Sequence, residues 1–169
     1  MTSYKAGVMN GQLIHYASES FTLDHTRRYV QPEAHAFGKP TGFWVSVAGD
    51  KDWPSWCRDE GFAIDRLAVE HAVTLASDAN VLHIKSVHDL DNFHDRYAVE
   101  TEDVRRYPTR SFRSWPIGWQ VVAEHYDGII IAPYQWSHRL NMEWYYGWDV
   151  ASGCIWNLAA IERFVRIEP

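Results

Sequence analysis

Tryptophan is the residue type in this sequence whose abundance most needs a chemical explanation. Most tryptophans in proteins supply volume to the core or cover its rim. A few of these side chains are instead expected to line a pocket for a flat ring, because nucleobases and nicotinamide stack on aromatic faces. A cationic nicotinamide between two such faces also gains a cation–π contribution of roughly 0.5–2 kcal/mol. The nine tryptophans lie at positions 44, 53, 56, 115, 119, 136, 144, 148 and 156.

The sequence offers little support for metal, thiol or P-loop chemistry. Nine histidines are present, but there is no HExxH motif, and His88 and His94 are spaced to fall on nearly opposite faces of a predicted helix. No GxSxG occurs, and Cys57 and Cys154 lie among aromatic residues, which favours structural thiols. The GxGxxG and GK[ST] fingerprints are also absent. We therefore expect no metal site and no P-loop hydrolysis of nucleotides.

The hydrophobic pattern predicts short strands interspersed with helices. Turn residues and capping signals delimit helices over 21–33, 52–60, 87–97 and 119–126. Residues 98–114 carry four arginines and indicate an exposed loop, and residues 134–146 are aromatic and ambiguous. The apolar runs 129–131 and 154–155 are expected to form adjacent central strands. Strands are predicted over 12–17, 43–47, 66–75, 81–86, 129–132, 153–157 and 161–167.

Strands therefore outnumber helices, and helices separate only some of them, which favours a mixed α+β class over a doubly wound parallel sheet. The chain has 169 residues, of which 46% are hydrophobic and 15% aromatic, so intrinsic disorder is excluded. The pattern contains no linker, internal repeat or low-complexity segment. We expect one domain over residues 1–169.

Three segments together carry a recognisable pattern. The first is LIHYAS at 13–18, an apolar strand with His15, and the second is GFWVS at 42–46, followed by PSWC at 54–57. The third is DGIII at 127–131 and, later, SGCIWN at 152–157. In order and spacing the three segments resemble the ADP-ribosyltransferase superfamily in its diphtheria-toxin and poly-ADP-ribose-polymerase branch, which carries His, Tyr and Glu on successive segments. The resemblance covers about a third of the chain.

This resemblance implies an α+β fold with a split, mixed β-sheet core and short flanking helices, and NAD as the cofactor. His15 would hydrogen-bond a ribose hydroxyl of NAD, and the backbone just after it, at Tyr16, would clamp the nicotinamide amide. Trp44 stands where the family has its second-motif Tyr. Trp56 matches the aromatic that stacks on the other face of the nicotinamide. Ser46 matches a serine that orients the third-motif residue in some branches.

The third motif departs from the family pattern. If CIWN at 154–157 matches the strand after the catalytic Glu, then the Glu position falls at Ser152, which has no carboxylate. A serine can grip a ribose hydroxyl weakly, but it cannot stabilise a cationic ribosyl group. The nearest substitutes are Asp149 and Glu143. Asp149 is preferred, because Glu143 falls in a helical stretch where a solvated acid is the simpler interpretation.

The resemblance implies transfer of ADP-ribose to a macromolecular acceptor, protein or nucleic acid. Two other function classes stay open. The Trp- and Tyr-rich run 134–148 matches the residue types that protein interfaces favour, so an inactive transferase-like fold could act as a protein-binding module. The same aromatic residues, with the arginines of 105–113, match a single-stranded nucleic-acid site.

Net charge and targeting signals limit the partners and the location. The chain has 16 Lys and Arg against 22 Asp and Glu, a net charge of −6, which argues against non-specific binding to nucleic acid or anionic membranes. The N-terminal MTSYKAG lacks the basic segment and the following apolar segment of a signal peptide, and no apolar run has the length of a membrane span. We expect a cytoplasmic protein with reduced cysteines. The small size resembles, by analogy only, that of a toxin, an antidote-type modifier or a viral effector.

Overall fold

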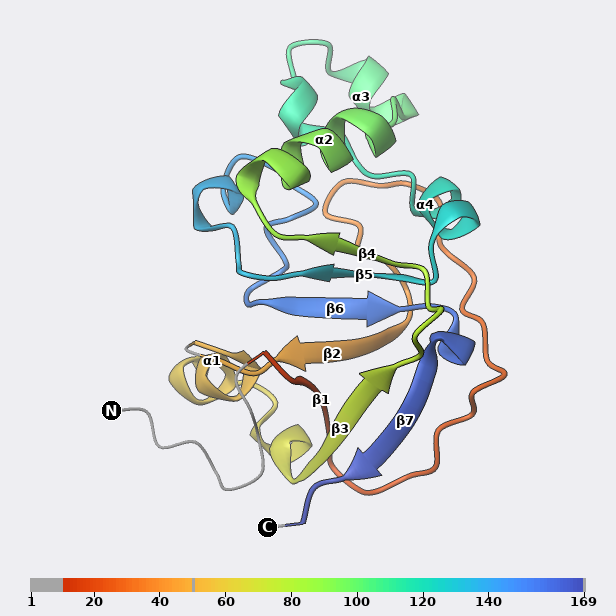
Figure 1. Cartoon of the computed structure of the whole chain (residues 1–169). Helices are drawn as coiled ribbons and strands as arrows, with labels where there is room; N and C mark the ends of the chain where they lie inside the picture. The colour runs from red at the N-terminus through yellow and green to blue at the C-terminus, as the bar shows by residue number, and fades with distance from the viewer. Residues whose placement is uncertain (1–10, 50, 169) are drawn as a thin grey trace.

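The computed structural model describes residues 11–49 and 51–168 of the chain (Figure 1). The N-terminal segment, in which we expected no signal peptide, lies outside the described residues. Seven strands are present in the described part: β1 (Leu13–Ala17), β2 (Phe43–Val47), β3 (Val69–Leu75), β4 (Val81–Ile84), β5 (Gly128–Ile131), β6 (Ser152–Ile155) and β7 (Ile161–Arg166).

These strands form one mixed sheet in the order β4-β5-β6-β2-β1-β3-β7. The pair β4 and β5 is parallel, and the other neighbouring pairs are antiparallel. Figure 1 shows β3 and β7 turned away from the direction of β4, β5 and β6, so that the sheet curls. The predicted mixed α+β class is therefore confirmed.

The described residues contain four short α-helices, and local signals explain their ends. Asp52 caps the first helix by accepting the Ser55 N–H, and Pro54 follows in its first turn, where a missing N–H costs nothing. Ser86 and Thr101 cap the next two helices in the same way. The helices are α1 (Trp53–Glu60), α2 (Val87–Tyr97), α3 (Glu102–Arg106) and α4 (Trp119–His125).

Two sequence-based predictions of local structure are wrong. Residues 21–33 contain no helix, because Asp24 accepts hydrogen bonds from both the N–H and the hydroxyl of Thr26, and the chain then runs on to pair Arg28 with Asn157. Tertiary hydrogen bonds override the local helical spacing here. Residues 98–114 are not all loop, since they include α3 and a short 3-10 turn over Phe112–Ser114.

The prediction that 129–131 and 154–155 form adjacent central strands is confirmed. Ile129 pairs with Cys154 in the antiparallel register of β5 and β6, and all four residues of each strand are buried. Gly153 permits this close packing, because a Cβ there would lie 2.7 Å from Ile130 Cγ1 and 2.8 Å from the Ile129 carbonyl oxygen. Continuous apolar runs belong where both faces of a sheet are covered.

Four of the nine tryptophans are explained by the core, since Trp119, Trp144, Trp148 and Trp156 are at most 3% exposed. Trp119, Trp144 and Trp148 are fully buried among the helices and the β5–β6 side of the sheet. Cys57 and Cys154 are buried free thiols, and burial raises the pKa of both. Of the helices that the structure describes, none has the length and apolar character that crossing a membrane requires.

Candidate functional site

The sheet splits between β1 and β2. The two strands pair only at Leu13 with Val47 and at Ile14 with Ser46. Beyond Ile14, strand β1 pairs only with β3, and the remaining part of β2 pairs only with β6. The His15 side chain reaches across the split, where its Nδ1–H donates to the Trp44 carbonyl oxygen over 2.7 Å. The His15 side chain thus makes a hydrogen bond between β1 and β2 where the two backbones no longer pair.

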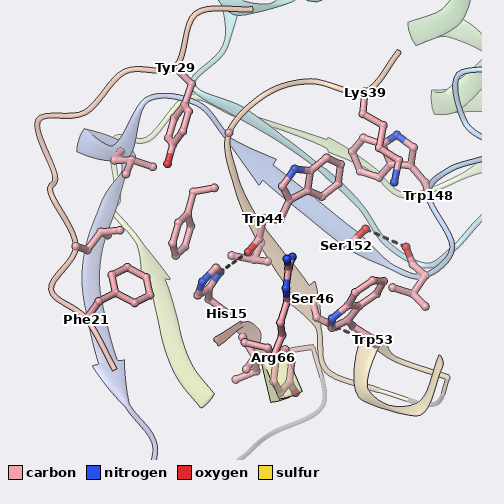
Figure 2. Close-up of a pocket in the computed structure, with 18 of the residues that line it drawn as sticks. His15, Phe21, Tyr29, Lys39, Trp44, Ser46, Trp53, Arg66, Trp148 and Ser152 are labelled. Atoms are coloured by element: carbon pink, nitrogen blue, oxygen red, sulfur yellow. Dashed lines mark hydrogen bonds between the residues drawn. The ribbon is translucent and has the colours of Figure 1, made fainter. Parts of the chain in front are cut away.

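A cavity of about 670 Å³ opens at this split (Figure 2). It takes side chains from three strands, β1, β2 and β6. The segment 21–29, the loops before β2 and β6, the start of α1 and the segment 62–66 complete the lining. Aromatic rings dominate its walls, as expected of a site for a planar ligand. The rings are Phe21, Tyr29, Phe43, Trp44, Trp53 and Trp148, with Phe62 beside them.

His15 is held as a neutral imidazole. Burial lowers its pKa, and its hydrogen bond to the Trp44 carbonyl fixes the proton on Nδ1. The ring stacks on Phe43 with 4.1 Å between centroids. Nε2 is consequently left as a hydrogen-bond acceptor, the role that a sugar hydroxyl requires.

Trp53, and not Trp56, lines the cavity beside Trp44. The Trp53 N–H donates to Ser46 Oγ over 3.2 Å, which anchors the start of α1 to β2. Trp56 lies behind Trp53 and stacks on it at 5.1 Å with an interplanar angle of 14°. The resemblance placed Trp56 at the ligand, whereas Trp53 is the member of this pair that lines the cavity, because the orientation of α1 depends on the Asp52 cap and the Ser46 contact.

Three cations line the cavity, Arg27, Lys39 and Arg66, and no motif in the sequence predicted them. Figure 2 shows Arg66 extending into the space between His15 and Trp53. The Arg27 guanidinium lies 4.2 Å from the centre of the Tyr29 ring, and the Lys39 amine lies 5.4 Å from that of Trp44. Arginine and lysine beside aromatic faces are suited to a ligand with both a ring and a phosphate.

Buried contacts fix the loop that carries Lys39. Trp119 Nε1–H donates to the Gly38 carbonyl over 2.9 Å. The Gln31 side chain forms hydrogen bonds to both the N–H and the carbonyl of Thr41. Burial lowers the pKa of Lys39, and the charge of Asp149 partly offsets this effect. The loop sequence Gly-Lys-Pro-Thr-Gly at 38–42 is typical of a turn and by itself does not mark Lys39 as a site residue.

The structure separates the two acids proposed for the third motif. Asp149 lines the cavity, where its carboxylate accepts from an Arg139 N–H over 3.3 Å. Glu143 does not line the cavity and forms an ion pair with Arg110 at 3.7 Å. Ser152 lines the cavity opposite Ser46 in the β2–β6 register. Its hydroxyl donates to the Val150 carbonyl over 3.0 Å.

Tyr16, the residue after His15, also lines the cavity. Burial raises its pKa strongly, and the negative charges of Glu70 and Asp52 add to this shift. The hydroxyl therefore stays protonated and able to donate. Within residues 11–49 and 51–168, no three His, Cys, Asp or Glu side chains are grouped so that they could hold a metal ion.

The run 134–148 is mainly core rather than surface. Met142, Trp144, Tyr145 and Trp148 are at most 1% exposed. A broad Trp- and Tyr-rich binding surface is therefore not formed, because these side chains pack against α2 and α4. The large apolar side chains that this run leaves exposed in the described structure are Trp136, Leu140 and Tyr146.

Comparisons with protein-family models, with curated proteins and with solved structures found no match for this chain. The functional assignment therefore depends on the site itself.

Proposed function

We propose that this chain is an NAD-dependent ADP-ribosyltransferase-like protein that binds NAD in the cavity at the split of the sheet and transfers ADP-ribose to a macromolecular acceptor. One observation carries the proposal. The segments that resemble the family motifs include four neighbouring strands, in the order β5-β6-β2-β1, and three of these strands contribute a side chain to the cavity, namely His15, Trp44 and Ser152.

The lining fits the chemical groups of NAD. Trp44 and Trp53 offer electron-rich faces to the cationic nicotinamide ring. His15 Nε2 is available to accept a hydrogen bond from a ribose hydroxyl. Arg66, with Arg27 or Lys39, can bind the pyrophosphate through charge-assisted hydrogen bonds. The volume lies within the range of about 300–1,000 Å³ that is typical of small-molecule sites.

Transfer would break the bond between ribose and nicotinamide and form one between the ribose and a nucleophilic atom of the acceptor, releasing nicotinamide and the acceptor's proton. The chain must then stabilise the positive charge that develops on the ribose. We assign that role to Asp149, which lines the cavity and whose charge acts on Lys39. The other acid of the lining, Asp24, is exposed and is occupied by its hydrogen bonds to Thr26. A carboxylate aimed at a developing charge in a site with little water contributes a few kcal/mol to the barrier. Arg139 holds this carboxylate in place through its ion pair.

A second candidate is binding without transfer. The family carries a Glu at the position that Ser152 occupies here, so a protein that holds NAD without cleaving it is the alternative. In that case the exposed side chains Trp136, Leu140 and Tyr146 would serve a protein partner.

Incubation with NAD labelled on its adenylate phosphate, together with a cell lysate, tests the proposal. We expect label to appear on a macromolecule, and digestion with protease or nuclease then identifies the acceptor class. The Asp149→Asn protein is the control, which should bind NAD but leave the lysate unlabelled. Intact NAD and unlabelled macromolecules with the wild-type protein would contradict transfer, and the second candidate would then be favoured if NAD still binds.

A further inference from the structure

Four side chains next to the cavity form an exposed group of aromatic rings and cations, here called the rim cluster: Lys51, Trp136, Arg139 and Tyr146. The Trp136 side chain is 55% exposed and that of Tyr146 is 49% exposed. The Lys51 amine lies 5.5 Å from the centre of the Trp136 ring. The Arg139 guanidinium lies 5.9 Å from the Trp136 ring centre and 5.8 Å from that of Tyr146. Each exposed ring therefore has a cation beside it.

The rim cluster connects to the cavity on two sides. Arg139 donates to Asp149, which lines the cavity. Lys51 stands directly before Asp52 and Trp53, the cap and first residue of α1, and Trp53 lines the cavity as well. A molecule bound on the rim cluster would lie next to the site proposed for NAD.

The rim cluster is also preorganised. The Trp136 ring packs edge-on against Tyr134 with 4.7 Å between centroids, and Tyr134 stacks on buried Tyr145. Arg139 is held by its hydrogen bond to Asp149, and its side chain is 30% exposed. A fixed ring beside a partly exposed guanidinium is arranged for a ligand that has a flat face and an anionic group.

We propose that the rim cluster is the acceptor subsite and that it binds single-stranded nucleic acid, with a base stacked on Trp136 or Tyr146 and a backbone phosphate bound by Lys51 and Arg139. This inference rests on the proposed function, because an acceptor must approach the ribose of NAD. Stacking of bases on aromatic side chains contributes about 1–3 kcal/mol per base and is tolerant of sequence.

Nucleic acid fits this surface better than a protein partner. A stable protein interface buries about 800 Å² on each side around an apolar core. In the described part of the run 134–148, only Leu140 adds a large exposed apolar side chain to the two rings. The net charge of −6 argues against a long duplex lying across the protein, but a local site for one or two nucleotides avoids that cost.

Fluorescence anisotropy with a fluorescein-labelled DNA strand of roughly ten nucleotides tests the inference, since binding is measured without NAD. An RNA strand of matching sequence, the corresponding DNA duplex and polyglutamate are measured in parallel. We expect the single strands to bind more tightly than the duplex and polyglutamate to compete poorly. Preference for one single strand over the other would show whether DNA or RNA is the acceptor.

Substitutions then locate the binding site. Trp136→Ala should weaken binding about tenfold, and Tyr146→Ala provides a second ring deletion. Arg139→Gln should weaken binding. It should also make the plot of log affinity against log salt concentration less steep by about 1, the change expected for the loss of one phosphate contact. Tyr107→Ala is the matched control, because Tyr107 is 56% exposed and has Arg110 at 5.9 Å but lies outside the rim cluster. Arg110 is also paired with Glu143, which reduces its attraction for a phosphate. Circular dichroism confirms that each variant is folded.

The outcomes distinguish this inference from the proposed function. A wild-type protein that binds NAD in calorimetry but binds no single strand would overturn the acceptor subsite and leave the NAD site standing. Equal affinity for duplex and single strand, equal competition by polyglutamate, or an equal loss with Tyr107→Ala would also overturn it. Binding of the single strand without any binding of NAD would overturn the proposed function and retain the rim cluster as a nucleic-acid site.

Discussion

The Nδ1–H of His15 donates to the main-chain carbonyl of Trp44 at the point where β1 and β2 part. The bond joins the residues that match the first and second motifs of the resemblance. It also sets the tautomer of the imidazole and leaves Nε2 as an acceptor. The His15 side chain therefore links β1 to β2 at the split and leaves its Nε2 free to accept a hydrogen bond from a ligand.

His15→Ala is expected to weaken NAD binding about tenfold, because it removes a hydrogen-bond acceptor for ribose and loosens the position of Trp44. His15→Asn keeps a donor near the position of Nδ1 and should lose less. Isothermal calorimetry measures both affinities, and thermal unfolding checks that each variant is folded. Equal NAD affinity in the wild type and in His15→Ala would remove this residue from the site.

Asp149→Asn keeps the size of the side chain but removes its charge. We expect transfer to fall about 10²–10³-fold while NAD affinity changes little, because the carboxylate acts on charge that develops during the reaction. Glu143→Gln is the matched control, since Glu143 pairs with Arg110 outside the cavity lining. Retention of transfer by both variants, measured as labelled acceptor, would place the catalytic acid elsewhere.

Gly153→Ala should destabilise the fold by about 1–3 kcal/mol, because the added Cβ would meet the Ile130 side chain and the backbone carbonyl of Ile129. At Gly147 a Cβ would meet the far end of the flexible Lys39 side chain, so Gly147→Ala should keep its stability. Urea denaturation measures both free energies of unfolding. Equal stability of the two variants would contradict the close packing of β5 and β6.

Acid is expected to destabilise the protein through histidines that are held neutral. Buried His94 accepts from Trp144 Nε1–H on Nδ1 and donates from Nε2 to the Phe112 carbonyl, so it has no place for a second proton. Burial lowers the pKa of His94 below its ordinary value of 6.5, and burial does the same for His15 and His71.

The direction of this pH effect follows from the difference in proton uptake between the unfolded and the folded chain. Below about pH 6.5 the unfolded chain binds protons that the folded histidines do not, so the free energy of unfolding should fall as the pH decreases through this value and stay nearly constant above it. Urea denaturation at pH 7.5 and pH 5.5 measures the difference. His94→Asn should be less stable at pH 7.5 but show a smaller loss on acidification. An unchanged loss would mean that His94 does not contribute to it.

Local signals were sufficient to predict much of the framework. Strand β2 and helix α1 match the sequence prediction closely, because the strand preference of a short aromatic and β-branched run and an Asp-x-Pro cap both act within a few residues. The adjacent β5 and β6 followed from apolar runs that need cover on both faces. By contrast, the helical spacing over 21–33 was misleading, since hydrogen bonds to distant residues determine that segment.

The site could be predicted only in part. His15, Trp44, Ser46, Ser152 and Asp149 all line one cavity, which their spacing in the sequence does not reveal. The choice of Trp53 over Trp56 depends on how α1 docks on β2. Lys39, Arg27 and Arg66 come from a loop, an extended segment and a 3-10 turn, so no periodic pattern marks them as partners.

Proton NMR of NAD mixed with the folded protein tests the central claim most directly, because it follows binding and cleavage in one sample. With the wild type we predict broadened nicotinamide resonances that are replaced over time by those of free nicotinamide, because water takes the place of the absent acceptor and ADP-ribose is released. With Asp149→Asn we predict the same broadening without the conversion. Sharp, unchanged NAD resonances in the presence of the wild-type protein would contradict both the NAD site and the chemistry proposed for it.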